Sequence, residues 1–381
     1  MLAPVEGHDE TRRALGRSAA AGQLPHSLLF HGPAGIGKQR LALWLGQLLL
    51  CERAADTEPC FECRACHLSQ RLEHPDLHWF FPMARPRGAS ADRLGDALEE
   101  ARAAELALRR AQPLRASLPI GMAGIYLAQV QALNRIASAR PAMGARKVFV
   151  VGDAELLVPQ EASPEAANAL LKLLEEPPAD STLVLTASEP ELLLPTIRSR
   201  LLPVRIQPLP VEAAARLLVE RGGADPERAL WAATLAGGSV GRALGFLPGA
   251  EGDGPLEEIR EQGRRLLAAA LAPSHGPALA LAHAESPAGA RAGFSDALES
   301  LTLWLRDLGA AASGAEDVVF NRDALEWLRG TARGLPGPGG VPAAIDVVEE
   351  TLQLAQLNIN PQLATAALLR RVRAALLDST S

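Results

Sequence analysis

The sequence predicts an α/β fold in which a parallel sheet carries helices on both faces. Short apolar segments at residues 147–151 (KVFVV) and 181–188 (STLVLTAS) alternate with longer segments of helical periodicity. Strands that are connected through helices in this way pair in parallel and are buried on both faces. No strand pattern returns after Pro210, so the last part of the chain is expected to be helical.

The composition is that of a mainly helical chain with two or three domains. The 381 residues are 48% apolar but only 4% aromatic, and Ala and Leu dominate. Lys and Arg number 38 against 44 Asp and Glu, whereas a stand-alone nucleic-acid binder needs a surplus of basic residues. The longest apolar stretch, LALWLGQLLL, is too short to span a membrane, and residues 1–13 contain no apolar run. We therefore expect a soluble, cytoplasmic protein.

The first predicted strand leads into a glycine-rich loop. Residues 27–31 form a short apolar strand, and a helix is expected from about Gln39. The sequence between them, GPAGIGK, matches a phosphate loop through its glycines and its lysine: Gly32, Gly35, Gly37 and Lys38. Such glycines let backbone N–H groups surround phosphate oxygens, and the lysine reaches the outer phosphates.

The residue after this lysine departs from the usual pattern. A phosphate loop normally continues with Ser or Thr, whose hydroxyl binds Mg²⁺, but this chain has Gln39. An amide on a longer side chain does not offer Mg²⁺ the same octahedral geometry.

The strand at residues 147–151 is followed by too few acids for hydrolysis. A hydrolysing site needs adjacent carboxylates, one for Mg²⁺ and one for the attacking water. The chain continues instead with Gly152, Asp153, Ala154 and Glu155. If Asp153 is the metal ligand, Ala154 stands at the water-polarising position; if Asp153 is the second acid, Gly152 stands at the metal position. Glu155 compensates only if the strand bulges. The missing acid and the missing hydroxyl at Gln39 are two independent losses at the metal position. Together they favour a fold that keeps the phosphate-binding loop but does not hydrolyse ATP.

All four cysteines lie close together and predict a structural metal site. Their spacing is C-x8-C-x2-C-x2-C, at Cys51, Cys60, Cys63 and Cys66. Four thiolates complete a tetrahedral zinc site and leave no open position for catalysis. The alternatives are four free thiols, or His67 or His74 in place of one cysteine.

An inserted segment interrupts the alternation of strands and helices. Leu77, Trp79 and Phe80 suggest a second strand, and over residues 85–121 the sequence pattern then changes. Inside this segment, residues 94–111 form a charged amphipathic helix with three leucines near one face: Leu94, Leu98 and Leu106. We expect a surface helix rather than a site.

Two further helices are expected before the strand at residues 181–188. The first covers residues 125–138, and the second, SPEAANALLKLLEEPP, begins with Ser163 as N-cap and Pro164 at the first helical position. At the end of the strand, Thr186 and Ser188 could sense a phosphate or cap a turn.

Three arginines follow that strand in the segment EPELLLPTIRSRLLPVRI: Arg198, Arg200 and Arg205. They are either surface residues near a helix end or, with a partner subunit, groups that stabilise charge on its bound phosphate.

After Pro210 the pattern is helical. Residues 211–223 and 225–238 read as two short helices, and GGSVGRAL either brings Arg242 over a nucleotide or simply starts a helix. A linker, PGAEGDGP, precedes residues 256–381, which are helical with a break at GLPGPGGVP.

The order of these motifs resembles the bacterial DNA polymerase III clamp-loader subunits of the AAA+ superfamily. The resemblance covers residues 1 to about 245 through specific motifs. It implies a P-loop domain at residues 1–207, with a zinc module at about 51–66 and the insertion at about 85–121. A small helical lid at 208–246 and an all-α collar at 255–381, which joins subunits into a ring, would follow.

The resemblance also implies roles for single residues. Two kinds of subunit in this family carry the zinc module, and the hydrolysing tau/gamma kind has an intact loop and acidic pair. Gln39 and Gly152 therefore favour the non-hydrolysing kind, without intrinsic ATPase activity but part of the DNA polymerase III holoenzyme. In LLPTIRSR, Arg200 would be the arginine finger for ATP on the adjacent subunit, with Leu201 where cysteine is usual. The implied partners are the tau/gamma and delta subunits, the sliding clamp indirectly, and primed DNA through the assembly.

Two other functions remain as alternatives. An active ATPase motor requires Gln39 and Asp153 to suffice at the metal, and Mg²⁺-dependent turnover by the chain alone distinguishes it. A zinc-dependent nucleic-acid-binding module is disfavoured by the net charge of -6.

Overall fold

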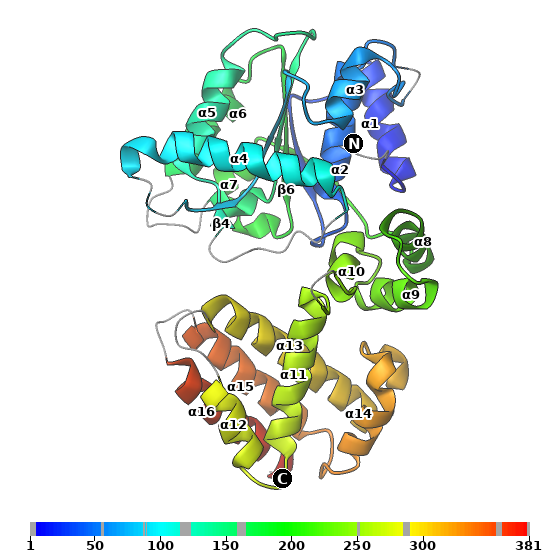
Figure 1. Cartoon of the computed structure of the whole chain (residues 1–381), viewed down its shortest axis with the longest axis vertical. Coiled ribbons are helices and arrows are strands. Elements are labelled where there is room, and N and C mark those ends of the chain that lie inside the picture. The colour runs from blue at the N-terminus through cyan, green and yellow to red at the C-terminus, as the bar shows by residue number, and fades with distance from the viewer. Residues whose placement is uncertain are drawn as a thin grey trace. The chain divides into compact units, whose positions relative to one another are not determined.

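A computed structural model describes most of the chain in two compact units (Figure 1). The described residues are 5–54, 57–86, 88, 90–114, 123–157, 165–249, 252–284, 290–355 and 360–378. The first unit is Met1–Gly245 and the second is Phe246–Ser381.

A five-stranded parallel sheet forms the centre of the first unit. Its strand order is β2-β5-β6-β1-β7, with bounds β1 (Ser27–His31), β2 (Leu77–Phe80), β5 (Lys147–Val151), β6 (Ser181–Ala187) and β7 (Leu202–Arg205). Every pairing between these strands is parallel. The strands predicted at residues 27–31, 147–151 and 181–188 are therefore confirmed.

Alternate residues of the central strands pack on opposite faces of the sheet. Val148 and Val150 of β5 belong to the core that contains α2 (Lys38–Leu50), whereas Phe149 and Val151 face α5 (Leu127–Ala137) and α6 (Glu165–Glu175). This two-residue period is what a strand buried between two helical layers requires. The predicted α/β class, a parallel sheet with helices on both faces, is confirmed (Figure 1).

The fifth strand, β7, is absent from the sequence-based prediction. It pairs with β1 at the edge of the sheet, and most of its residues are exposed, so it has no apolar run to reveal it. Pro203 lies within it, which an edge strand tolerates because only one side of the strand is bonded. A short antiparallel ribbon of β3 (Met83–Ala84) and β4 (Ala123–Gly124) also went unpredicted.

The inserted helix is α4 (Leu94–Ala111), and it lies against the first unit's core through the predicted leucine face. Leu98 is 1% exposed, and Leu94 and Leu106 pack on the same cluster. The predicted helix start at Ser163 and Pro164 lies outside the described residues.

Smaller elements complete the first unit: α1 (Asp9–Ala20), α3 (Arg64–Gln70), α7 (Pro195–Arg198), α8 (Val211–Gly222), α9 (Pro226–Leu235) and α10 (Val240–Phe246). The 3₁₀ turns are Ala91–Arg93, Ala154–Leu157 and Pro190–Leu192. As predicted, two helices follow Pro210.

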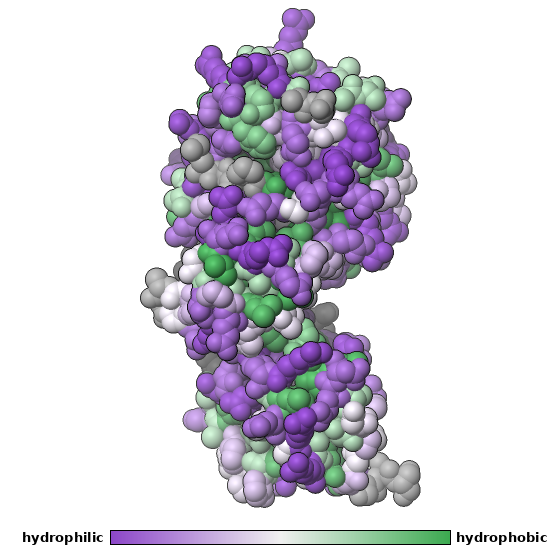
Figure 2. Space-filling view, turned by 90° about the vertical axis from the view of Figure 1, so that its right-hand side faces the viewer, coloured by the Kyte–Doolittle hydropathy of each residue, from purple (hydrophilic) through white to green (hydrophobic). Residues whose placement is uncertain are grey.

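In the described residues of the second unit the regular elements are helices, as predicted. Its helices are α11 (Pro255–Leu271), α12 (Gly276–Ala284), α13 (Ala290–Ala312), α14 (Leu325–Ala332), α15 (Gly340–Ala355) and α16 (Pro361–Leu377), with 3₁₀ turns at Glu316–Val318 and Arg322–Ala324. Trp304 of α13 is 1% exposed at the centre of the core. No helix in the described part of either unit is long and apolar enough to cross a membrane. Hydrophilic residues predominate on the face shown in Figure 2.

Asp76 holds the turn before β5 in place. This residue is 1% exposed, and its carboxylate accepts hydrogen bonds from the backbone N–H groups of Ala142 (2.6 Å), Met143 (2.8 Å) and Gly144 (2.8 Å). Burial by itself raises the pKa of Asp76, but the three N–H donors outweigh it and hold the pKa below its ordinary value of 3.8. The ionised carboxylate therefore stabilises the folded chain.

Asp76→Asn should lower the free energy of unfolding by about 1–3 kcal/mol, because an amide offers one acceptor oxygen to three donors. The pKa of Asp76 is lowered on folding, so its contribution is complete above the unfolded pKa and disappears as the pH falls through the folded value. Urea unfolding at pH 7 and at pH 3 measures both effects. Asp346→Asn, at an exposed position of α15, is the control. Equal losses for both variants at pH 7 would contradict this role.

Candidate functional site

The candidate site lies where the carboxyl ends of β1, β5 and β6 meet beside the glycine loop. These strands are adjacent in the order β5-β6-β1, so residues that follow them converge although they are far apart in sequence. Gly35 of the loop has φ +75°, and a Cβ there would lie 2.6 Å from the Ser239 hydroxyl and 2.7 Å from the backbone nitrogen of Arg242. Only glycine fits this close approach.

Lys38 has all three of its ammonium hydrogens in use. Its Nζ donates to the carbonyls of Gly32 (2.9 Å) and Pro33 (2.8 Å) and to Ser188 Oγ (3.0 Å). The residue is 5% exposed. Burial lowers the pKa of Lys38, while the nearby carboxylates of Asp153 and Glu155 oppose that shift. The lysine here binds the loop itself.

Gln39 is held on both sides of its amide group. Its Nε2 donates to Asp153 Oδ2 at 2.9 Å, and its Oε1 accepts from the indole Nε1 of Trp79 at 3.0 Å. A Cβ at Gly152 would lie 2.5 Å from both Cδ and Oε1 of Gln39. Gln39 and Gly152, which the sequence presented as two separate departures, therefore lie in contact, because the amide occupies the space beside the glycine.

The two acidic residues after β5 form hydrogen bonds with different partners. Asp153 adopts a left-handed backbone with φ 47°, and its N–H donates to Thr186 Oγ1 at 3.0 Å. Glu155 Oε1 accepts from the N–H groups of Ser188 (2.7 Å) and Glu189 (3.4 Å). Burial raises the pKa of both Asp153 and Glu155. Glu155 lies in a 3₁₀ turn and supports the end of β6, so no bulged strand brings it in as the missing acid.

The start of α10 binds the glycine loop through backbone carbonyls. Ser239 Oγ donates to Ala34 O at 2.8 Å, and the Gly241 N–H donates to Gly35 O at 2.8 Å. The side chain of Arg242 begins against Gly35, but the residue as a whole is exposed. The predicted motif GGSVGRAL does return to the loop, through the serine and glycine.

Arg200 lies at a different place in the first unit. Its guanidinium donates to Glu175 Oε1 at 2.7 Å and to the carbonyl of Thr196 at 2.8 Å. Its side chain is 35% exposed. Leu201 next to it is 6% exposed and packs in the core under α6 and α7. The other predicted arginines, Arg198 and Arg205, are exposed.

The four predicted cysteines come together. All four sulfur atoms lie within 4.8 Å of one another. Two of the sulfur pairs, Cys51 with Cys63 and Cys60 with Cys66, are 3.9 Å apart, close to the edge of about 3.8 Å of a tetrahedron with bonds of about 2.3 Å to zinc. The Glu62 N–H bonded to its sulfur lowers the pKa of Cys60 to about 6, whereas burial raises the pKa of Cys51 and of Cys66. The cluster is of the right size and chemistry for a metal ion.

Several residues that shape the site were not predicted. The sequence indicates only that Trp79 belongs to a strand and Arg109 to a surface helix. In the structure the two are in contact, with the Arg109 guanidinium 4.5 Å from the Trp79 ring centre. Glu175, which holds Arg200, stands inside a helical motif with no signal of its own. The sequence signal for this contact is Trp79 itself: a tryptophan in a buried strand needs a hydrogen-bond acceptor for its indole N–H.

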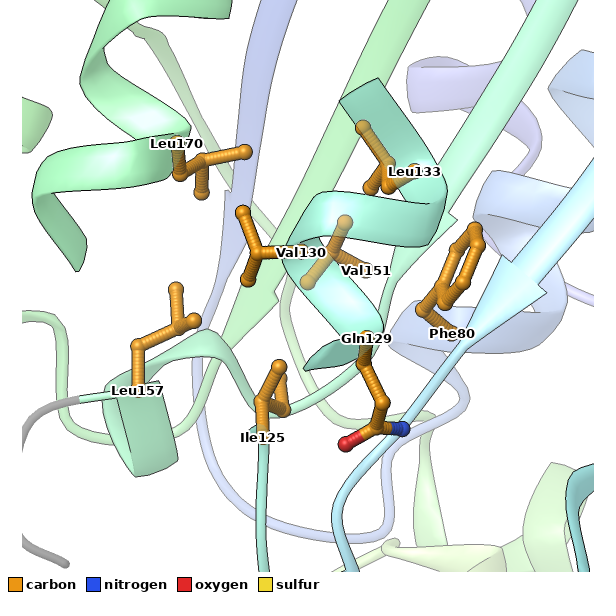
Figure 3. A pocket seen from close by; sticks show the side chains of 8 residues that line it. All are labelled: Phe80, Ile125, Gln129, Val130, Leu133, Val151, Leu157 and Leu170. Carbon is orange, nitrogen blue, oxygen red and sulfur yellow. The ribbon is translucent and has the colours of Figure 1, made fainter. Parts of the chain in front are cut away.

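A small apolar cavity between α5, α6 and β5 does not add a ligand site (Figure 3). Its volume is about 10 Å³, at the lower limit for one water molecule. Gln129 is its polar neighbour, and the amide donates to Phe81 O and accepts from the Tyr126 N–H. In Figure 3 this amide points away from the apolar side chains. The cavity is a packing gap.

Comparison with known proteins identifies the family. The model of the family described as "DNA polymerase III, delta subunit" matches residues 7–210, which is more than half of the 381 residues. The chain belongs to this family. The match includes the glycine loop, the cysteine cluster and Arg200.

Related proteins of this family carry the name "DNA polymerase III subunit delta'". The Pseudomonas aeruginosa protein is 35% identical over 219 residues, and the Escherichia coli protein is 32% identical over 232 residues. The alignments cover 57% and 61% of this chain and 54% and 57% of those proteins, so the chain spans about half the length of these relatives. The solved structure of a DNA polymerase III, gamma subunit-related protein from Thermotoga maritima matches at 14% identity over 94% of this chain and 98% of its own, with a TM-score of 0.42. The predicted resemblance to DNA polymerase III subunits is confirmed by the family model and by relatives that carry the delta' name.

Proposed function

We propose that the chain is a non-hydrolysing, delta-prime-type subunit of a DNA polymerase III clamp loader. The observation that carries this proposal is the direct hydrogen bond from Gln39 to Asp153, since it engages the two residues that should hold Mg²⁺. A P-loop ATPase needs a hydroxyl and a carboxylate at those positions. The subunit would support loading of the sliding clamp onto primed DNA in the cytoplasm, together with tau/gamma and delta subunits.

The proposed domains follow the family resemblance. A P-loop domain at residues 1–207 would carry the sheet, a lid at 208–246 would comprise α8 to α10, and residues 255–381 would form the collar that joins the ring. The contacts of Ser239 and Gly241 with the glycine loop support a lid held against the P-loop domain.

Arg200 is proposed to act on ATP bound by the adjacent subunit. An arginine that works in trans must be able to leave its own surface, and Arg200 is anchored only by partly exposed contacts. Its partner Glu175 has a side chain that is 49% exposed, so the pair costs little to separate. A guanidinium placed on the transferred phosphate stabilises the charge of the transition state.

Arg200→Ala should abolish the contribution of this subunit to hydrolysis. In the reconstituted loader with clamp and primed DNA, hydrolysis at the adjacent site should fall by about 10³-fold or more. Total turnover should then drop to what the remaining sites supply, while the chain alone shows no turnover. Arg198→Ala, at the last residue of α7, two positions before Arg200 and also exposed, is the matched control. Turnover by the chain alone would indicate a motor instead, and equal rates for both variants would reject Arg200 as the finger.

The cysteine cluster is proposed to hold one structural zinc ion. Four thiolates would fill every position of a tetrahedral zinc ion, so the ion would connect the end of α2 to α3 without a catalytic role. The ligands would be Cys51, Cys60, Cys63 and Cys66.

One zinc ion per chain should therefore co-purify. Cys63→Ser should lose that ion and lower Tm by about 5 °C or more, because metal binding contributes to the folding free energy. Metal content by mass spectrometry and thermal unfolding check both. His67→Ala, exposed and adjacent, should keep the ion and the Tm. A metal-free preparation with unchanged stability would refute the site, and DNA binding by the chain alone that a chelator removes would favour a nucleic-acid module.

A further inference from the structure

We propose that the Gln39 amide is a built-in substitute for the metal ion and that Gly152 is present to make room for it. The two residues, 113 positions apart, would then be one structural unit that closes the metal position from within. This inference rests on the proposed function in one respect: it treats residues 39, 152 and 153 as the positions that hold Mg²⁺ in a hydrolysing P-loop protein.

The orientation of the amide is dictated from both sides. The indole N–H of Trp79 can only donate, so it selects the Oε1 atom of Gln39. The carboxylate of Asp153 can only accept when it is ionised, so it selects Nε2. The one atom of Gln39 that could bind a cation is therefore turned toward Trp79, and N–H hydrogens face the carboxylate. A positively polarised donor takes the place of the cation beside Asp153.

The space beside the amide explains the glycine. A Cβ at residue 152 would lie 2.5 Å from Cδ and Oε1 of Gln39 and 2.7 Å from Nε2. Gly152 does not have the positive φ that would itself demand glycine. The far end of a free side chain could move aside, but this amide is fixed by Trp79 and Asp153. Any side chain at residue 152 must therefore break those two hydrogen bonds.

The inserted helix supports the same unit. Arg109 of α4 places its guanidinium 4.5 Å from the ring centre of Trp79 and 4.0 Å from that of Phe81. Arg102, also on α4, donates to the Trp79 carbonyl at 3.2 Å. Helix α4 thus holds the tryptophan that holds Gln39, which gives the insertion a place in the site.

A thermal-unfolding cycle on the isolated full-length chain tests the pairing. Gly152→Ala should lower Tm by about 4 °C or more in the native background, because two partly buried hydrogen bonds are lost. In a Gln39→Ala background the same change should cost less than about 1 °C. Gly95→Ala, where the nearest atom would be 3.9 Å away, is the control. Equal costs in both backgrounds would overturn the pairing.

The closed metal position has its own spectroscopic test. In chain labelled with ¹⁵N-tryptophan, the Trp79 indole resonance is assigned with Trp79→Phe. Gly152→Ala and Gln39→Ala should both shift it. Mn²⁺ should leave this resonance sharp in the native chain and broaden it in the double variant Gln39→Thr, Gly152→Asp.

Each outcome of the Mn²⁺ experiment decides the inference. Broadening in the native chain would show an open metal position, and no broadening in the double variant would show that Gln39 and Gly152 are not what closes it. Should the double variant fail to fold, the thermal cycle still decides the pairing. Both experiments use the chain alone, so their failure is distinct from failure of the Arg200 assay in the assembled loader.

Discussion

The hydrogen bonds of the Gln39 amide are the interaction on which the rest of the candidate site depends. They connect the first turn of α2 to the end of β5 through Asp153 and to β2 through Trp79. Because the amide lies in the space that a side chain at Gly152 would need, it also determines the residue at that position. The neutral Gln39 amide thus joins these elements through hydrogen bonds within the chain.

The glycine loop serves the structure in the same way. Lys38 donates to the carbonyls of Gly32 and Pro33, and the start of α10 donates to those of Ala34 and Gly35. Four successive carbonyls thus have partners within the chain. The loop is thereby hydrogen-bonded to the start of α10.

Two features lie outside this region and have separate physical bases. The cysteine cluster brings four sulfur atoms within 4.8 Å of one another where α2 leads into α3, so its effect is on local stability. Arg200 is exposed and is held by Glu175, so its chemistry is directed to the outside of the unit. The proposed role of Arg200 in a partner's site is thus independent of the interactions around Gln39. An experiment that rejects one of these two proposals leaves the other unaffected.

The sequence by itself determined the features that depend on local order along the chain. The strands at residues 147–151 and 181–188 were predictable because both faces are buried, the glycine loop because its residues are consecutive, and the cysteine cluster because its ligands lie within one short segment. Strand β7 was not, since an exposed edge strand that contains Pro203 has no apolar pattern. Only the tertiary structure showed that Gln39, Trp79 and Gly152 meet. Their contact is created by the order of strands in the sheet, which does not follow the order of residues in the chain.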